Sequence, residues 1–193
     1  DFDAIREGVV DFQNTSLRLK YARKPVIAAI QGMTVGGGME FAIHSSRIVA
    51  HADANMGLVE AGVGLIPGGG GGKEMLTRTI SCVDALGYTD YNPPVLELWR
   101  NIAMGTVSRN AFHAREMGYL LPEDKIVMQI DLLPQMAKEE VLRMARDGYR
   151  QKLPRMTNAP GDSGRAHIAQ TINAMKEGKW ISDYDSVVSM AVA

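Results

Sequence analysis

Two glutamates stand in glycine-rich stretches of the sequence and could act together as an acid/base pair. Glu40 follows three glycines in VGGGMEF (35–41), and Glu60 lies in GLVEAGVGLIPG (57–68). Glycines at a helix start leave peptide N–H groups open, which can bind an oxygen that gains negative charge. Two carboxylates among apolar neighbours could exchange protons in a dry pocket. Alternatively, Glu40 is only a first-turn helix acid and Glu60 only a solvated loop residue, and the pattern alone leaves both readings open.

The five consecutive glycines at 68–72 resemble a phosphate-binding loop, but they fit neither common nucleotide motif. A P-loop ending at Gly72 and Lys73 would need a glycine where Pro67 stands and a Ser or Thr where Glu74 stands. The dinucleotide fingerprint fails as well, because Lys73, Glu74 or Met75 would occupy its third glycine position. We therefore expect the run to allow close packing and to place backbone amides, not to bind a nucleotide.

The first half of the chain alternates predicted helices and strands around these motifs. Apolar spacing predicts an amphipathic helix over 3–22, and KPVIAAI (24–30) is typical of a buried strand. A helix near 38–46 and a strand at 47–52 follow. Residues 54–72 are expected to be mostly loop, with a helix over 71–80 and a surface loop over 83–94.

The second half is predicted to be mainly helical. Ser108 and Gly118 are suitable N-cap and C-terminal residues for a helix between them, and 125–128 is a candidate strand. Helices are expected over 132–148, 165–177 and 182–193, with a polar turn at 157–164 and a solvated charged face at 138–152. The pattern indicates an α/β fold with a C-terminal helical region.

Composition narrows the possible functions. The 193 residues carry a formal net charge of −1, which argues against a nucleic-acid binder. No apolar run approaches the length of a membrane span, and no secretory signal is visible. The lone cysteine, Cys82, fits a reducing, cytoplasmic setting. The four histidines lack metal-ligand spacing, so we expect no metal site.

Residues 24–71 closely resemble the central segment of the crotonase (enoyl-CoA hydratase/isomerase) superfamily. Members read K-P-x-I-A-A-x-x-G-x-x-x-G-G-G-x-E and then F/M-G-x-x-E-x-x-x-G-x-x-P-G-x-G-G, and every element of both patterns is present here without a gap. The segment VSRNAFHAREMGYLLPEDKIV (107–127) resembles the following helix and strand of the family more loosely. The resemblance implies a crotonase-like (ClpP/crotonase) α/β fold.

The resemblance also implies roles for particular residues. Gly37 would donate an oxyanion-hole N–H to the thioester carbonyl, while Glu40 and Glu60 would activate water and exchange a proton with the α-carbon. Both glutamates favour hydration of a trans-2-enoyl-CoA to a 3-hydroxyacyl-CoA, because many isomerases of the family keep only the second. Further contacts to the acyl-CoA thioester are expected from the flanking residues Val35, Gly36, Gly38, Val59, Gly64, Leu65, Pro67 and Gly68.

The segment GLVEAGVGLIPGGGGGKEML (57–76), with an apparent insertion near 81–94, is most similar to the C-terminal part of bacterial bifunctional 3-hydroxyacyl-CoA dehydrogenases of β-oxidation. That likeness implies NAD only for a dehydrogenase part outside these residues, and no cofactor within them. We expect a partial crotonase core at 1–106, incomplete at its N-terminal side, and a helical region of the same domain at 107–193. Because the family's second oxyanion amide comes from upstream of this pattern, the 193-residue chain alone is expected to be nearly inactive.

Two alternatives to hydration remain. The domain could be a catalytically silent module for oligomerisation or for holding acyl-CoA, or it could be an enoyl-CoA isomerase. Crotonase-type domains commonly form trimers through C-terminal helices, and the apolar end of this sequence leads us to expect a homo-oligomer.

Overall fold

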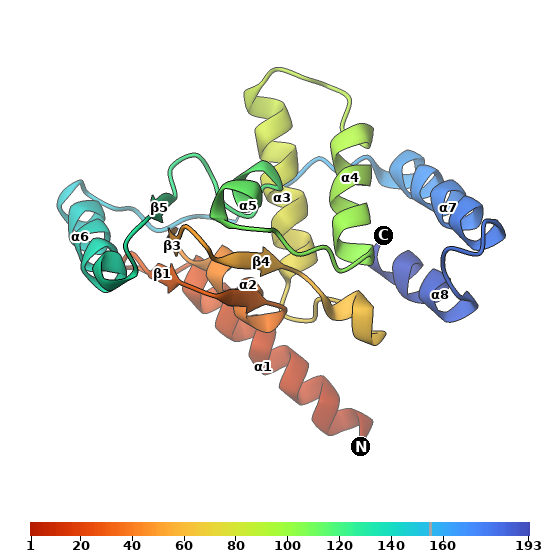
Figure 1. The fold of residues 1–193 in the computed structure, drawn as a ribbon, viewed down its shortest axis with the longest axis horizontal. Helices are drawn as coiled ribbons and strands as arrows, with labels where there is room; N and C mark the ends of the chain where they lie inside the picture. Colours follow the sequence, from red (N-terminus) through yellow and green to blue (C-terminus); the bar gives the residue numbers. More distant parts are fainter. Residues whose placement is uncertain (155) are drawn as a thin grey trace.

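The centre of the molecule consists of two small parallel β-sheets. We describe a computed structural model of the chain, which covers residues 1–154 and 156–193 (Figure 1). The larger sheet has the order β1–β3–β5, with β1 (Ile27–Ile30), β3 (Arg47–His51) and β5 (Lys125–Val127). The smaller sheet pairs β2 (Met33–Val35) with β4 (Asn55–Gly57). Parallel neighbours require a crossover connection, and α2 (Gly37–His44) supplies it for both sheets.

Helices surround the sheets and bury one main core. α1 (Phe2–Lys20) and α3 (Gly71–Ala85) both pack on α2, and α6 (Leu133–Arg146) packs on β1 and β3. The core joins α2, the strands and α3, and its fully buried members include Met39, Ile43, Ile48, Met56 and Leu58. This packing places the N-terminus of α3 beside the N-terminal turn of α2.

A second group of helices lies at the opposite end of the molecule from α6 (Figure 1). α4 (Asn92–Ala103) packs on α3, and α7 (Gly161–Glu177) and α8 (Asp183–Val192) pack on α4 through a cluster centred on Trp99, Ile168 and Ile172. The remaining elements are η1 (Glu60–Val63), α5 (Ala111–Glu116) and η2 (Ile130–Leu132). Contacts of α8 with η1 bring the end of the chain close to Glu60.

The predicted alternation of strands and helices is confirmed, but several local predictions were wrong. The polar turn expected at 157–164 extends too far, because α7 already begins at Gly161. The segment 83–94 is not simply a loop: α3 continues to Ala85 because Ile80 and Val83 are buried, and α4 already begins at Asn92. Ser108 does not cap α5. Its hydroxyl accepts the N–H of Met56 at 2.9 Å, while the side chain of Asn110 caps the helix through the N–H of His113 at 2.8 Å.

The charged face predicted at 138–152 also contains a buried residue. Glu140 has no exposed surface and lies within 2.7 Å of the Lys125 ammonium and 2.6 Å of the Arg143 guanidinium, with Arg47 at 3.7 Å. Hydrogen bonds from Arg143 are the largest influence and, with Lys125, lower the pKa of Glu140 to about 2. Glu140 therefore links α6 to Arg47 on β3 and Lys125 on β5 through ion pairs. Helical periodicity alone did not predict that Glu140 is buried.

Candidate active site

Glu40 binds the N-terminus of the neighbouring helix. It lies in the first turn of α2, only 1% exposed, and its carboxylate accepts N–H bonds from Gly71 at 2.7 Å and Gly69 at 3.0 Å. These amides belong to the glycine run that opens α3, where Gly70 is the N-cap in the left-handed region at φ +97°. A carboxylate at this position satisfies amides that the helix leaves unpaired and is favoured by the helix dipole.

Close packing explains why several of these positions are glycine. A Cβ on Gly69 would lie 2.7 Å from the Phe12 ring and 2.8 Å from Glu40 Oε2, and one on Gly71 would lie 2.9 Å from Glu40 Cγ. The Phe12 ring also leaves only 2.9 Å for a Cβ on Gly37. The glycine run thus serves close packing and amide placement, as predicted, and the two amides bind the carboxylate of Glu40.

Glu60 has a different environment. It is the first residue of η1, and both of its carboxylate oxygens are buried without a hydrogen-bond partner among the described residues. Burial raises the pKa of Glu60 above its usual value, and the negative charge of Glu40 raises it further. The N–H groups of Glu60 and Val59 oppose this shift in pKa, although they lie outside hydrogen-bond geometry.

Gly36 connects the two glutamates. It lies at φ +55°, its N–H donates to the carbonyl of Gly57 at 3.0 Å, and its carbonyl accepts the N–H of Glu40 at 2.9 Å. A Cβ on Gly36 would lie 3.5 Å from Glu60 Oε1. Next to it, Gly37 opens α2 with an N–H that an α-helix does not use internally. The structure therefore places Gly36, Gly37, Glu40 and Glu60 in one site.

The other residues predicted to contact substrate lie in different environments. Val35 ends β2 opposite Gly57, and Gly38 in α2 has open space where a Cβ would lie, with no neighbouring atom within 4 Å. Gly64, at φ +77°, lies against the ring of Tyr184 from α8. The remaining ones are Val59 at the start of η1, the 62% exposed Leu65, Pro67 at a small cavity, and Gly68, whose carbonyl accepts from Gln13.

Two buried residues near the site were not predicted from the sequence. His44 is 1% exposed, its Nδ1–H donates to the carbonyl of Glu40 at 2.6 Å, and burial lowers its pKa. Tyr119 is also 1% exposed, and its hydroxyl oxygen accepts the N–H of Leu58 at 3.2 Å. The i to i+4 spacing from Glu40 could have indicated His44, whereas nothing local links Tyr119 to Leu58.

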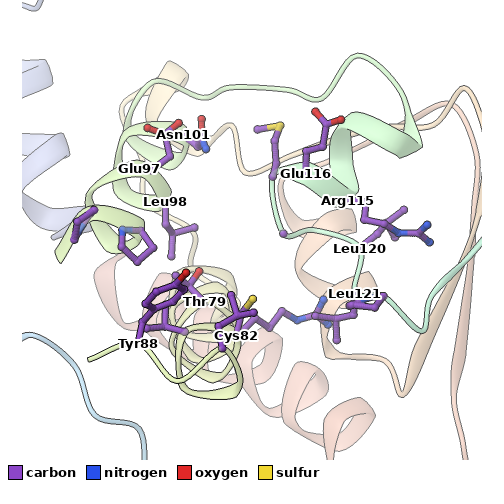
Figure 2. A pocket seen from close by; sticks show the side chains of 18 of the residues that line it. Thr79, Cys82, Tyr88, Glu97, Leu98, Asn101, Arg115, Glu116, Leu120 and Leu121 are labelled. Carbon is purple, nitrogen blue, oxygen red and sulfur yellow. The ribbon is translucent and has the colours of Figure 1, made fainter. Parts of the chain in front are cut away.

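A large cavity lies elsewhere in the molecule. It has a volume of about 950 Å³ and opens between the C-terminal part of α3, α4 and α5, with Cys82, Leu98 and Glu116 on its walls (Figure 2). None of Gly37, Glu40 and Glu60 lines it. We place the candidate active site at the glutamate pair, because there a buried acid, a second carboxylate and a helix-opening amide converge.

Neither a metal centre nor a membrane span is visible in the described part of the chain. Across residues 1–154 and 156–193, His, Cys, Asp and Glu side chains form no group of three that could hold a metal ion. In the same residues, no helix combines the length and apolar character needed to cross a membrane.

Comparison with known proteins places this site in a family. Residues 6–103, which contain both glutamates and both glycine stretches, match the family described as enoyl-CoA hydratase/isomerase. The chain belongs to this family. The resemblance to the crotonase superfamily predicted from the sequence is therefore confirmed.

Similar proteins include chains that are much longer than this one. The "Probable 3-hydroxyacyl-CoA dehydrogenase" of Bacillus subtilis is 38% identical over 182 residues, which are 94% of this chain and 22% of that relative. The human peroxisomal bifunctional enzyme is 54% identical over 63 residues, 33% of this chain and 9% of its own length. The chain thus spans only a minor part of these relatives.

Solved structures share the fold. Enoyl-CoA hydratase from Bacillus anthracis superposes with a TM-score of 0.59 at 24% identity, covering 98% of this chain and 60% of that one. Pseudomonas aeruginosa DspI gives a TM-score of 0.59 at 23% identity, covering 94% and 58% of the two chains. These matches confirm the predicted crotonase-like α/β fold.

Proposed function

We propose that this chain carries the hydration centre of an enzyme that converts trans-2-enoyl-CoA to 3-hydroxyacyl-CoA in fatty-acid β-oxidation. The observation that carries the proposal is the pairing of an amide-bound carboxylate, Glu40, with a buried and unpartnered one, Glu60, on either side of Gly36. Family membership supports the reaction type, and the names of the relatives support the pathway.

In this proposal the two glutamates have separate roles. Glu40 already accepts two N–H bonds, but a carboxylate has about four lone-pair sites, so it can still bind and orient a water molecule. Glu60, whose pKa burial raises, can carry a proton at a pH where an ordinary glutamate is ionised. Unequal environments of this kind separate the acid and base roles of paired carboxylates.

The proposed step is an addition of water across the C2–C3 double bond. The water oxygen bonds to the β-carbon and gives a proton to Glu40, while Glu60 delivers its proton to the α-carbon. Transfer of the proton from Glu40 to Glu60 restores the starting state. Negative charge that develops on the thioester oxygen is stabilised by the N–H of Gly37.

The test is Glu60→Gln in the full-length natural protein, assayed by hydration of crotonyl-CoA. We expect kcat to fall ~10²–10⁴-fold, the contribution of a positioned acid or base. Glu97→Gln on α4 is the matched control, because that side chain is 61% exposed and pairs only with Arg100 at 3.1 Å among the described residues. Activity of Glu60→Gln within a few-fold of the parent would refute the proposal.

Isomerisation of 3-enoyl-CoA is a second candidate, favoured by the fact that only Glu60 has both oxygens buried and free of hydrogen bonds among the described residues. One carboxylate suffices there, because it removes a proton from C2 and returns it to C4. Glu40→Gln separates the two reactions: hydration is lost in the hydratase, whereas an isomerase keeps its turnover.

The remaining features of the whole protein belong to the same proposal. We infer that the hydration centre works beside an NAD-dependent 3-hydroxyacyl-CoA dehydrogenase part, as the name of the Bacillus subtilis relative suggests. A homo-oligomer, a cytoplasmic location and a division of the chain near 106/107 are further predictions. A silent acyl-CoA-holding module remains the alternative, and an inactive full-length parent that still binds acyl-CoA would support it.

A further inference from the structure

His44 ends α2 one helical turn after Glu40 and is almost completely buried, with 1% of its surface exposed. Its Nδ1 lies 2.6 Å from the carbonyl oxygen of Glu40. Because a carbonyl oxygen only accepts hydrogen bonds, the imidazole carries a proton on Nδ1. In the neutral ring the other nitrogen, Nε2, is then an acceptor, and it is buried without a partner among the described residues.

The Nε2 edge of the His44 ring faces the glycine turn that opens α3. A Cβ on Gly70 would lie 3.5 Å from Nε2 and 3.6 Å from Cε1 of His44. Gly70 stands between Gly69 and Gly71, the two residues whose N–H groups bind the carboxylate of Glu40. The side chains of His44 and Glu40 therefore both extend from α2 to the same three-residue turn.

These contacts fix the His44 side chain at both edges of its ring. The bond from Nδ1 to the carbonyl of Glu40 sets the orientation of the ring plane. Gly70, at φ +97°, has no side chain on this face, so its backbone can lie against the ring. His44 thus sets the spacing between the backbone of Glu40 and the amides that bind the Glu40 carboxylate.

The surroundings of His44 favour the neutral ring. Burial is the main cause that lowers its pKa, and the ammonium groups of Lys20 on α1 and Lys73 on α3 lower it further. The carbonyl of Glu40 and the carboxylate of Glu74 oppose this shift, but Glu74 is itself paired with Lys20. An imidazolium would also need an acceptor for a proton on Nε2, and the described residues supply none.

We propose that His44 is a positioning residue for Glu40: its neutral imidazole, protonated on Nδ1, links the backbone of Glu40 to Gly70 and so keeps the Glu40 carboxylate on the amides of the glycine turn. The role rests on the proposed function, in which Glu40 binds water and takes its proton. It deepens that function by naming a histidine, outside the glutamates and glycines of the two motifs, that fixes the geometry of the water-binding carboxylate.

The experiment compares His44→Asn and His44→Leu in the full-length natural protein. Asparagine places an N–H where Nδ1 stands, whereas leucine fills the space without a donor. We expect kcat for crotonyl-CoA hydration to fall about 10–100-fold in His44→Leu with KM within about twofold, because displacing a reacting group slows chemistry more than binding. In His44→Asn kcat should fall only about threefold, because the bond to Glu40 is kept and the contact with Gly70 is lost.

A role in packing alone would give the opposite order of activities. Leucine would then preserve kcat, and asparagine, which is smaller, would leave a cavity and lower it. That order, or equal losses in the two variants, would overturn the proposal. His167→Leu is the control and should keep parent activity, because this histidine is exposed on α7.

A ¹⁵N spectrum of the histidine-labelled parent tests the tautomer without substrate. At pH 7 we expect the shifts of a neutral ring with its proton on Nδ1, in a signal that is absent from His44→Asn. A proton on Nε2 instead, or an imidazolium at this pH, would overturn the role of His44. A parent that does not hydrate crotonyl-CoA but shows the expected tautomer would refute the proposed function only.

If His44→Leu does not fold, the amide resonances of Gly69 and Gly71 in His44→Asn replace it. Both N–H groups bind Glu40 in the parent, so their shifts report whether the carboxylate stays in place. We expect them to remain close to the parent shifts, because asparagine keeps the bond to the Glu40 backbone. Displacement of both resonances in a folded His44→Asn would overturn the proposal.

Discussion

The carboxylate of Glu40 accepts two backbone N–H bonds at the start of α3, whereas the carboxylate of Glu60, across Gly36, has no hydrogen-bond partner among the described residues. Both residues stand in glycine-rich backbone, but the glycines serve different purposes. Around Glu40 they allow close approach of the carboxylate and the Phe12 ring, and beside Glu60 Gly36 provides a turn. Similar sequence settings can therefore give one acid whose carboxylate is fixed by backbone amides and one whose carboxylate has no hydrogen-bond partner among the described residues.

This contrast predicts opposite effects of the two glutamates on stability. Glu40→Ala should lower the free energy of unfolding by about 2–5 kcal/mol, because it leaves two buried N–H groups unpaired at ~1–3 kcal/mol each. Glu60→Gln should leave it unchanged or raise it, since a buried carboxylate without partners among the described residues is removed. Urea unfolding at neutral pH measures both variants, and equal losses would contradict the comparison.

Glu140 extends the comparison to a third buried glutamate. Its carboxylate is bound by cationic side chains, whereas the carboxylate of Glu40 is bound by backbone amides. The lowered pKa of Glu140 means that its stabilising effect is complete above about pH 4.5 and is lost as the pH falls through its folded value of about 2. Burial raises the pKa of Glu60, so stability linked to Glu60 instead falls as the pH rises from 4.5 through its folded value.

Glu140→Gln should therefore destabilise the protein by about 1–2 kcal/mol at pH 7, a value reduced because Lys125 and Arg143 also reach solvent. The difference from the parent should shrink toward pH 2. Unfolding curves between pH 2 and pH 7 give the result, and a difference that stays constant over this range would contradict the assigned cause.

The smallest expected effect distinguishes two nearby glycine positions. Gly36→Ala should destabilise by about 1–2 kcal/mol, because an L residue is strained at φ +55°, whereas the methyl group itself would only touch Glu60 at 3.5 Å. Gly38→Ala should stabilise by roughly 0.5–1 kcal/mol, since it lies in α2 with open space for the methyl group. Thermal melts of both variants test this, and a shared sign would show that the conformation at Gly36 is not the cause.

Local sequence predicted the elements and the position of the glutamates well, because periodicity and glycine placement are local signals. It did not predict which acid would be bound, since the partners of Glu40 lie some thirty residues further along at Gly69 and Gly71. The caps of α5 show the same limit: Ser108 and Asn110 are both suitable N-cap residues, and the choice depends on β4, which uses the hydroxyl of Ser108. The burial of Glu140 likewise depends on cations from β3 and β5.

The strand order β1–β3–β5 has a consequence for biosynthesis. β3 is complete at His51, but its second neighbour begins only at Lys125, so the ribosome must make the whole glycine loop and α3 to α5 first. At translation rates of about 5–20 residues per second, one edge of β3 stays without its partner for several seconds. An unpaired strand edge is a template for association with other chains. A nascent chain stalled before residue 125 should therefore depend on chaperones that shield this edge.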